Sequence, residues 1–135
     1  MIVEPYLFFD GRCEEALEFY KKAIGAQVMY MMRFKENPDA SSDPPGAGEK
    51  ILHATFRIGD TTLFASDGSN QGKPNFQGFG LSIAVKTEAE TKKIFDALAD
   101  GGRVELPLQK TFFSPSFGMV FDRFGVMWMV TIPTM

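Results

Sequence analysis

The sequence predicts an α+β fold built from two similar modules, each running strand, helix and then three strands. Three observations support it: a helical apolar pattern occurs once in each half, strand-like apolar runs follow both helices, and turn-forming residues separate the halves at 68–77. We therefore expect a single domain over 1–135, with one βαβββ module at 1–67, a linker at 68–77 and a second module at 78–135. Such a repeat predicts a curved mixed sheet with a ligand-binding cleft on its concave side.

The first module contains the clearest helix pattern in the chain. From Cys13 to Ile24, apolar residues recur at helical spacing, while acidic residues come early and lysines late, as the helix dipole prefers. Gly25 is suited to end this helix in a left-handed conformation. The elements expected here are a strand at 2–9, the helix at 13–24, a strand at 26–35 and a hairpin of strands 51–58 and 61–66.

Residues 37–49 form a long predicted loop within that module. The stretch holds three prolines, two glycines and no large apolar residue. A loop of this length is functional in some domains and a tolerated surface excursion in others, and both interpretations stay open.

The second module repeats the plan. Thr87 followed by Glu90 forms a capping box that opens a helix, and Gly101 follows its end. Asp122 is expected to bond its own backbone in the turn that ends at Gly125. The elements expected here are a strand at 79–85, the helix at 88–100, and strands at 104–113, 117–122 and 126–132.

Composition narrows the function classes. The chain has 135 residues and a net charge of −3, and its basic residues are scattered, which argues against a nucleic-acid partner. No apolar run approaches the ~20 residues that span a bilayer, and the N-terminus lacks the basic start of a signal peptide, so we expect no membrane partner and a cytoplasmic location.

The 14 Phe and 8 Met predict a soft interior or pocket wall.

Cys13 is the only cysteine, which excludes an intrachain disulfide and fits a reducing compartment. Its place in the first turn of a helix favours a lowered thiol pKa. No second nucleophilic partner is evident in the sequence, so we expect a structural role for it.

Three segments give the chain a family resemblance: PYLFFDGRCEEALEFYKKAIGA, HATFRIGDTTLFASD and QKTFFSPSFGMVFDRFGVMW. They resemble the PhnB-like branch of the vicinal oxygen chelate superfamily, which includes glyoxalase I, extradiol dioxygenases, and the fosfomycin and bleomycin resistance proteins. The resemblance covers nearly the whole chain and implies the glyoxalase/bleomycin resistance/dioxygenase-like fold. The branch also carries the description "3-demethylubiquinone-9 3-methyltransferase domain". No glycine-rich loop follows the first predicted strand to hold S-adenosylmethionine, so we do not expect methyl transfer.

The resemblance also implies where metal ligands would lie. The positions that match the superfamily's ligands are Pro5, Gly80 or Leu81, about Met129, and the stretch 64–66, with Asp67 just past it. Pro, Gly, Leu and Met at the first three cannot hold zinc, nickel or iron in the way that His and carboxylate side chains do. The chain has one histidine, so we expect no metal and no other cofactor.

That histidine, His53, belongs to a different predicted strand. Strand alternation places it with Thr55 and Arg57 on one face, while the apolar residues between them pack against the first helix. We expect Arg57 to anchor an anionic group, His53 to act as an acid–base, and Asp67 to hold the tautomer of His53.

Other interpretations of the same residues remain open. In the alternative interpretation, His53 is only a hydrogen-bond partner of Thr55, a loop or a backbone carbonyl at a dimer contact, and Arg57 is a cross-strand surface residue. Trp128 and Met129 are the expected ligand contacts in the last strand, with a core role as the alternative for Trp128.

The leading prediction is a metal-free homodimer that binds a small organic molecule in a Phe/Met-lined cleft. The alternative is an enzyme acting on a small carbonyl or anionic substrate, with His53 as acid–base and Arg57 as anchor. A third hypothesis is a metalloenzyme whose site is shared across a dimer interface.

Overall fold

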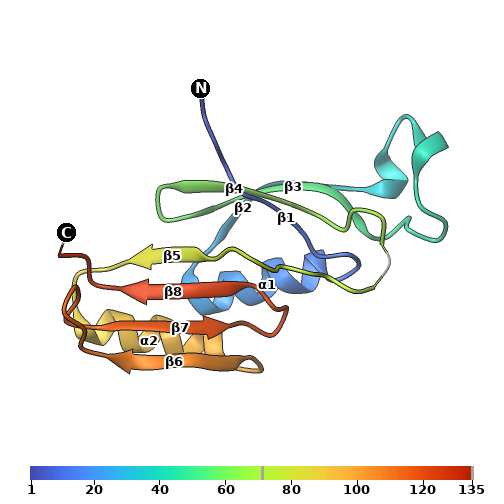
Figure 1. Cartoon of the computed structure of the whole chain (residues 1–135). Coiled ribbons are helices and arrows are strands. Elements are labelled where there is room, and N and C mark those ends of the chain that lie inside the picture. The colour runs from blue at the N-terminus through green and yellow to red at the C-terminus, as the bar shows by residue number, and fades with distance from the viewer. Residues whose placement is uncertain (71, 135) are drawn as a thin grey trace. The chain divides into compact units, whose positions relative to one another are not determined.

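The computed structural model describes residues 1–70 and 72–134, without the side chain of Ser42. These residues form two compact units, Met1–Asn75 and Phe76–Met135. Each unit consists of a four-stranded mixed sheet and one α-helix (Figure 1). The predicted α+β fold and its repeated βαβββ order are confirmed.

The sheet of the first unit has the strand order β1-β4-β3-β2. The β1 strand is parallel to β4, and the other neighbours are antiparallel. Its elements are β1 (Tyr6–Phe8), α1 (Cys13–Ile24), β2 (Gln27–Arg33), the 3₁₀-helices η1 (Phe34–Glu36) and η2 (Ala40–Ser42), β3 (Ile51–Ile58) and β4 (Thr61–Ser66).

The α1 helix and the hairpin of β3 and β4 have the predicted bounds. Gly25 follows α1 with a φ of 70°, the left-handed conformation expected of it. Tyr20 on the buried side of α1 stacks against Phe56 of β3, with ring centroids 6.3 Å apart. The prediction that the apolar side of β3 packs on this helix is therefore confirmed.

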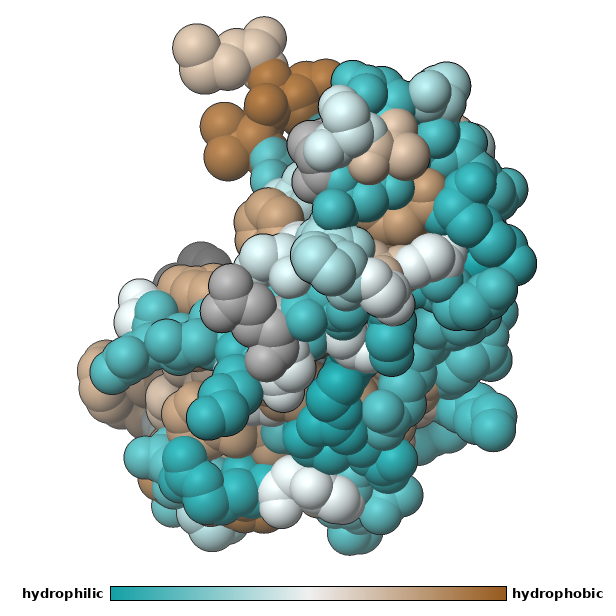
Figure 2. Space-filling model, turned by 90° about the vertical axis from the view of Figure 1, so that its right-hand side faces the viewer, coloured by the Kyte–Doolittle hydropathy of each residue, from teal (hydrophilic) through white to brown (hydrophobic). Residues whose placement is uncertain are grey.

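Two strands of this unit are shorter than predicted. The β1 strand begins at Tyr6 instead of residue 2, and the last backbone bond at that end runs from Phe64 N–H to the carbonyl of Pro5. Residues 1–3 are apolar and exposed, and hydrophobic atoms project at the N-terminal end in Figure 2. The β2 strand ends at Arg33 because Phe34–Glu36 turn into a 3₁₀-helix.

The second unit has the equivalent strand order, β5-β8-β7-β6, again with one parallel pair. Its buried core includes Phe95 and Leu98 of the helix beneath Val120, Trp128 and Val130 of the sheet. Its elements are β5 (Leu81–Ala84), α2 (Glu88–Ala99), β6 (Arg103–Gln109), β7 (Phe117–Phe121) and β8 (Met127–Thr131).

The cap of α2 is confirmed, since the Thr87 hydroxyl accepts a bond from Glu90 N–H at 3.1 Å. The β6 strand ends four residues earlier than predicted. The chain turns after it, with Thr111 N–H bonded to the carbonyl of Ser114 at 2.8 Å. The Ser114 hydroxyl then ties this turn to the carbonyl of Ile132. No helix within the described residues is both long enough and apolar enough to cross a membrane.

Candidate ligand-binding face

The side of the first sheet opposite α1 carries His53, Thr55 and Arg57. Residues paired directly across antiparallel strands share one face of a sheet. Met32 lies opposite His53, and Thr55 has Tyr30 on one side and Phe64 on the other. Gln27 and Thr62 flank Arg57 in the same way. We call this the His53 face; it also includes Tyr6 and Phe8 of β1, which pairs in parallel with β4.

Both ring nitrogens of His53 have a hydroxyl neighbour. The Tyr6 hydroxyl lies 2.9 Å from Nδ1, and the Thr55 hydroxyl lies 3.3 Å from Nε2. A neutral imidazole donates from one nitrogen and accepts at the other, and both hydroxyls can play either part. Tyr6, His53 and Thr55 therefore form a hydrogen-bonded network that runs from β1 to β3.

Aromatic rings surround this chain of hydroxyl and imidazole groups. The His53 ring centroid is 5.6 Å from those of Tyr6 and Phe64 and 6.3 Å from that of Tyr30. The Tyr6 ring also stacks on Phe8 at 4.8 Å. Tyr6, Phe8 and Tyr30 are 40%, 55% and 50% exposed, so the unit itself leaves much of this aromatic surface uncovered.

Partial burial also keeps the Tyr6 hydroxyl in its neutral form. Desolvation raises the pKa of its hydroxyl above the ordinary value for tyrosine, outweighing hydrogen bonding from Ser66, which lowers it. The hydroxyl therefore stays protonated at neutral pH and can donate to Nδ1 of His53.

Arg57 stands at the other end of the same face. Within residues 1–70 and 72–134, its guanidinium takes part in no hydrogen bond or ion pair. Its strand neighbours Gln27 and Thr62 are uncharged. The group is half-buried and keeps its full capacity to bind an anion.

The expected pairing of Asp67 with His53 does not occur in the structure. The Asp67 side chain is 1% exposed and accepts three backbone bonds: Oδ1 from Gly11 N–H and Cys13 N–H, and Oδ2 from Ile51 N–H, at 2.7 to 2.8 Å. It joins the start of α1 to the start of β3. We correct its proposed role from acid–base partner to structural anchor, because three backbone donors already occupy the carboxylate.

The two expected contacts in β8 belong to the second unit. Trp128 is 2% exposed and donates from Nε1 to Oδ2 of Asp122 at 2.8 Å, so the core alternative describes it and a ligand-stacking role does not. Asp122 also accepts bonds from Phe124 N–H and Val126 N–H, as its predicted turn role requires. Met129 is half-buried on the side of its sheet opposite Trp128, where it pairs with Met119 and Ser82.

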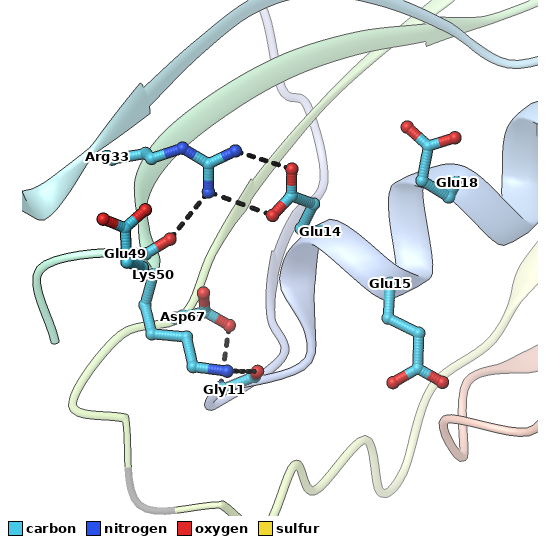
Figure 3. A pocket seen from close by; sticks show the side chains of 8 residues that line it. All are labelled: Gly11, Glu14, Glu15, Glu18, Arg33, Glu49, Lys50 and Asp67. Carbon is cyan, nitrogen blue, oxygen red and sulfur yellow. Dashed lines mark hydrogen bonds and ion pairs between the residues drawn. The ribbon is translucent and has the colours of Figure 1, made fainter.

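A separate pocket of about 410 Å³ lies on the first unit beside α1. Figure 3 shows Arg33 between Glu14 and Glu49, with Lys50 beside Gly11 and two further glutamates along α1. Arg33 binds Glu14 through two bonds of 2.6 and 2.9 Å and also donates to the carbonyl of Glu49. The Lys50 ammonium donates to the carbonyl of Gly11 at 2.8 Å. Small-molecule sites are mostly apolar with a few convergent polar groups, and the His53 face fits that description better than this pocket of mutually paired charges.

Cys13 is fully buried at the start of α1. Burial raises the pKa of its thiol, and the nearby carboxylates of Asp67 and Glu14 raise it further. The lowered thiol pKa expected from its helix position is therefore wrong, because desolvation and negative neighbours outweigh the helix terminus.

No group of three or more His, Cys, Asp or Glu side chains within the described residues is arranged to hold a metal ion. His53 itself lies among hydroxyls and aromatic rings, away from the carboxylates of the pocket.

The comparisons with known proteins agree on one family. The model of the family described as 3-demethylubiquinone-9 3-methyltransferase matches residues 2–131. The chain belongs to this PhnB-like family. Protein YjdN of Escherichia coli is 36% identical to it, over 98% of the chain and 95% of that protein.

Two solved structures extend the PhnB-like assignment to the fold. Protein PA1353 from Pseudomonas aeruginosa superposes with a TM-score of 0.86 at 37% identity, covering 98% of both chains. A Bacillus cereus structure described as a PhnB protein superposes with a TM-score of 0.82 at 28% identity, covering 98% of this chain and 99% of that one. Two more distant structures share the fold, each with a TM-score of 0.69: the fosfomycin resistance protein FosX from Listeria monocytogenes at 10% identity, and a glyoxylase/bleomycin resistance protein/dioxygenase domain from Frankia sp. at 15% identity.

The aromatic members of the His53 face are not evident from the sequence alone. Tyr6, Tyr30 and Phe64 each lie in a segment predicted as a strand, but only the strand pairing brings them around His53. The available signal was their alternation within those strands, since Tyr6 and Phe8 are two residues apart.

Proposed function

We propose that this PhnB-like protein binds a small organic molecule on the His53 face, with an aromatic or planar part of the ligand resting on the Tyr6, Phe8, Tyr30 and Phe64 rings. The observation that carries the proposal is the partly exposed aromatic cluster around a histidine whose two nitrogens are both within reach of hydroxyls. His53 and Thr55 supply polar contacts, and Arg57 attracts an anionic group. Met129, on the open side of the second sheet, stays a prediction for ligand contact within its own unit.

Methyl transfer, which the family description names, has no support in the architecture of the chain. Both sheets are largely antiparallel, with one parallel pair each. Nucleotide-type cofactors bind in doubly wound folds at a glycine-rich turn after the first parallel strand. In this chain β1 is followed by a turn and α1, and the Asp67 carboxylate accepts bonds from Gly11 N–H in the turn and from Cys13 N–H at the start of α1. That carboxylate therefore occupies the position that an anionic cofactor group would take.

A thermodynamic test uses two exposed phenylalanines. We expect isothermal titration with naphthalene-2-carboxylate to show binding, and Phe8→Ala to weaken it by roughly threefold to tenfold, the range of one aromatic contact. Phe112→Ala is the matched control, because Phe112 is 97% exposed in the second unit and lies outside the His53 face. Equal weakening by both substitutions, or no binding of any aromatic anion, would count against the proposal.

The runner-up function is catalysis, favoured by one contact, the 2.9 Å approach of the Tyr6 hydroxyl to Nδ1 of His53. With Nδ1–H donating to the Tyr6 oxygen, the unprotonated Nε2 of His53 could take a proton from a ligand carbon next to a carbonyl and return it to that carbon. Deuterium uptake by phenylpyruvate in heavy water tests this, with His53→Gln as the variant. Exchange at the buffer rate with the wild-type protein rules out this reaction.

We also propose that the protein is a cytoplasmic homodimer that works without a metal ion. Support for the dimer comes from the edge strand β2, which exposes Met29, Tyr30 and Met31 in succession. Sedimentation equilibrium measures the oligomeric state, and a monomer at all concentrations would remove this part of the proposal. The alternative is a metal site shared across a dimer interface, and elemental analysis of the purified protein for zinc, nickel or iron tests it.

A further inference from the structure

We infer that the His53 face selects an elongated organic anion, with its negative group at Arg57, a planar body across Thr55, and a hydrogen-bonding group at the His53–Tyr6 pair. This inference rests on the proposed function and specifies the class of ligand.

The strand register separates two kinds of side chain along the face. Around His53 lie the aromatic or soft side chains of Tyr6, Phe64 and Met32. Around Arg57 lie the small or polar side chains of Gln27 and Thr62. The face therefore has an aromatic end and a cationic end instead of one mixed centre.

Thr55 lies between these two ends. Its cross-strand neighbours are Tyr30 and Phe64, so the middle of the face is also flanked by flat rings. A planar ligand body can lie there against two aromatic side chains, while the hydroxyl of Thr55 remains bonded to His53.

The charge on the face is concentrated at one point. Among the residues of β1 to β4 on this face, Arg57 is the permanently charged group, and no carboxylate accompanies it. An arginine with no partner among the described residues can form two parallel bonds with a carboxylate or phosphate. The charged side chains that line the pocket beside α1 are already bonded to other charged side chains or to backbone groups.

The spacing sets the length of the ligand. Arg57 lies four positions after His53 in the extended strand β3, so their Cα atoms are about 13 Å apart at the usual rise of a β-strand. This spacing favours a ligand with two rings joined end to end between its polar ends over a ligand with one ring.

Calorimetry with matched compounds tests this selection. 4′-Hydroxybiphenyl-4-carboxylate has both polar ends, its 4-carboxamide analogue lacks the charge, and biphenyl-4-carboxylate lacks the hydroxyl. We expect Arg57→Gln to weaken the carboxylate roughly tenfold and to leave the carboxamide unchanged. We expect Tyr6→Phe to weaken the hydroxylated compound a few-fold and to leave biphenyl-4-carboxylate unchanged. Lys93→Gln is the control for charge, because Lys93 is an exposed cation on α2.

The one-ring compound 4-hydroxybenzoate supplies the test of length, since it should respond to one of the two substitutions and not to both. Response to both, or equal weakening of the carboxylate and the carboxamide by Arg57→Gln, overturns the inference. If smaller aromatic ligands bind but no two-ring compound does, the length requirement fails and the proposed function stands. If amide shifts in the NMR spectrum of β3 and β4 stay unchanged with every aromatic ligand, the proposed function fails as well.

Discussion

Asp67 connects three segments of the first unit through a single side chain. Its carboxylate follows β4 and receives backbone N–H groups from the turn after β1, from the start of α1 and from the start of β3. Each of these N–H groups is buried or partly buried, so water cannot fully replace the Asp67 carboxylate as their acceptor. Both carboxylate oxygens of Asp67 therefore bond to backbone N–H groups and not to His53.

The first prediction concerns this anchor. We expect Asp67→Asn to lower the free energy of unfolding by about 3 kcal/mol, because an amide removes the charge and turns a donor toward a backbone N–H. Urea unfolding followed by circular dichroism measures the change. Asp60→Asn, in the exposed turn between β3 and β4, is the control and should change the free energy little. A change at Asp67 no larger than at Asp60 contradicts the anchor role.

Cys13 gives a second prediction. Because burial raises the pKa of the thiol, little thiolate exists at neutral pH, and the folded protein should resist alkylation. Iodoacetamide at pH 8 followed by intact-mass spectrometry should show an unmodified native protein and a singly modified one in urea. Fast labelling of the native protein would indicate that Cys13 is accessible.

The elements of the fold differ in how far sequence alone predicts them. The α1 helix and the hairpin strands have the predicted bounds because periodicity, Gly25 and the turn at Gly59 specify them locally. The β1 and β6 strands are shorter than predicted, because strand length depends on how far a partner strand runs and not on apolar content. The residues of the His53 face likewise depend on how the strands pair, which the sequence alone does not specify. Alternation predicts that His53 and Arg57 share a face, but the register alone adds Tyr6 and Tyr30.

The ion pair between Glu14 and Arg33 joins α1 to the end of β2 and allows a prediction for pH. The bond with Arg33 holds the pKa of Glu14 below its usual range. A carboxylate with a lowered pKa stabilises the fold above its ordinary pKa, and this stabilisation is lost as the pH falls through the lowered value. We therefore expect Glu14→Gln to be destabilising at pH 7 and to match the wild type in strong acid.

Urea midpoints measured from pH 7 down to pH 2 check this dependence. Glu88→Gln is the matched control, since Glu88 lies in the first turn of α2, as Glu14 does in α1, and has no arginine partner among the described residues. A difference between Glu14→Gln and wild type that persists at pH 2 contradicts the ion-pair explanation.

At the scale of the whole molecule, the two units repeat one topology but differ in chemistry. Each has a parallel edge strand, a helix on one side and a partly open face on the other. The open side of the first sheet carries tyrosines, His53 and Arg57, whereas that of the second carries Met119, Met129 and the ring of Phe121, with Arg103 4.4 Å above it. The two units thus share one strand order, while the open side of the first sheet carries His53, Thr55 and Arg57 as hydrogen-bonding groups.

The metal-free proposal makes a prediction for the intact protein. Protein purified without a metal-binding tag should contain less than stoichiometric zinc, nickel or iron by elemental analysis, and EDTA should leave its melting temperature unchanged. A bound ion that prefers the folded state would stabilise it by mass action, so removal would lower that temperature. Stoichiometric metal together with a fall in melting temperature would favour the site shared between subunits.

The positions of the chain's chromophores determine which signal can report each event. Trp128 is the single tryptophan, and its indole is enclosed in the second unit against Asp122. Two of the three tyrosines, Tyr6 and Tyr30, instead border His53 in the first unit. Tryptophan emission should therefore follow unfolding of the second unit, while tyrosine absorbance near 280 nm follows occupancy of the His53 face. The chain carries two optical probes, and no label is needed to tell loss of structure from ligand binding.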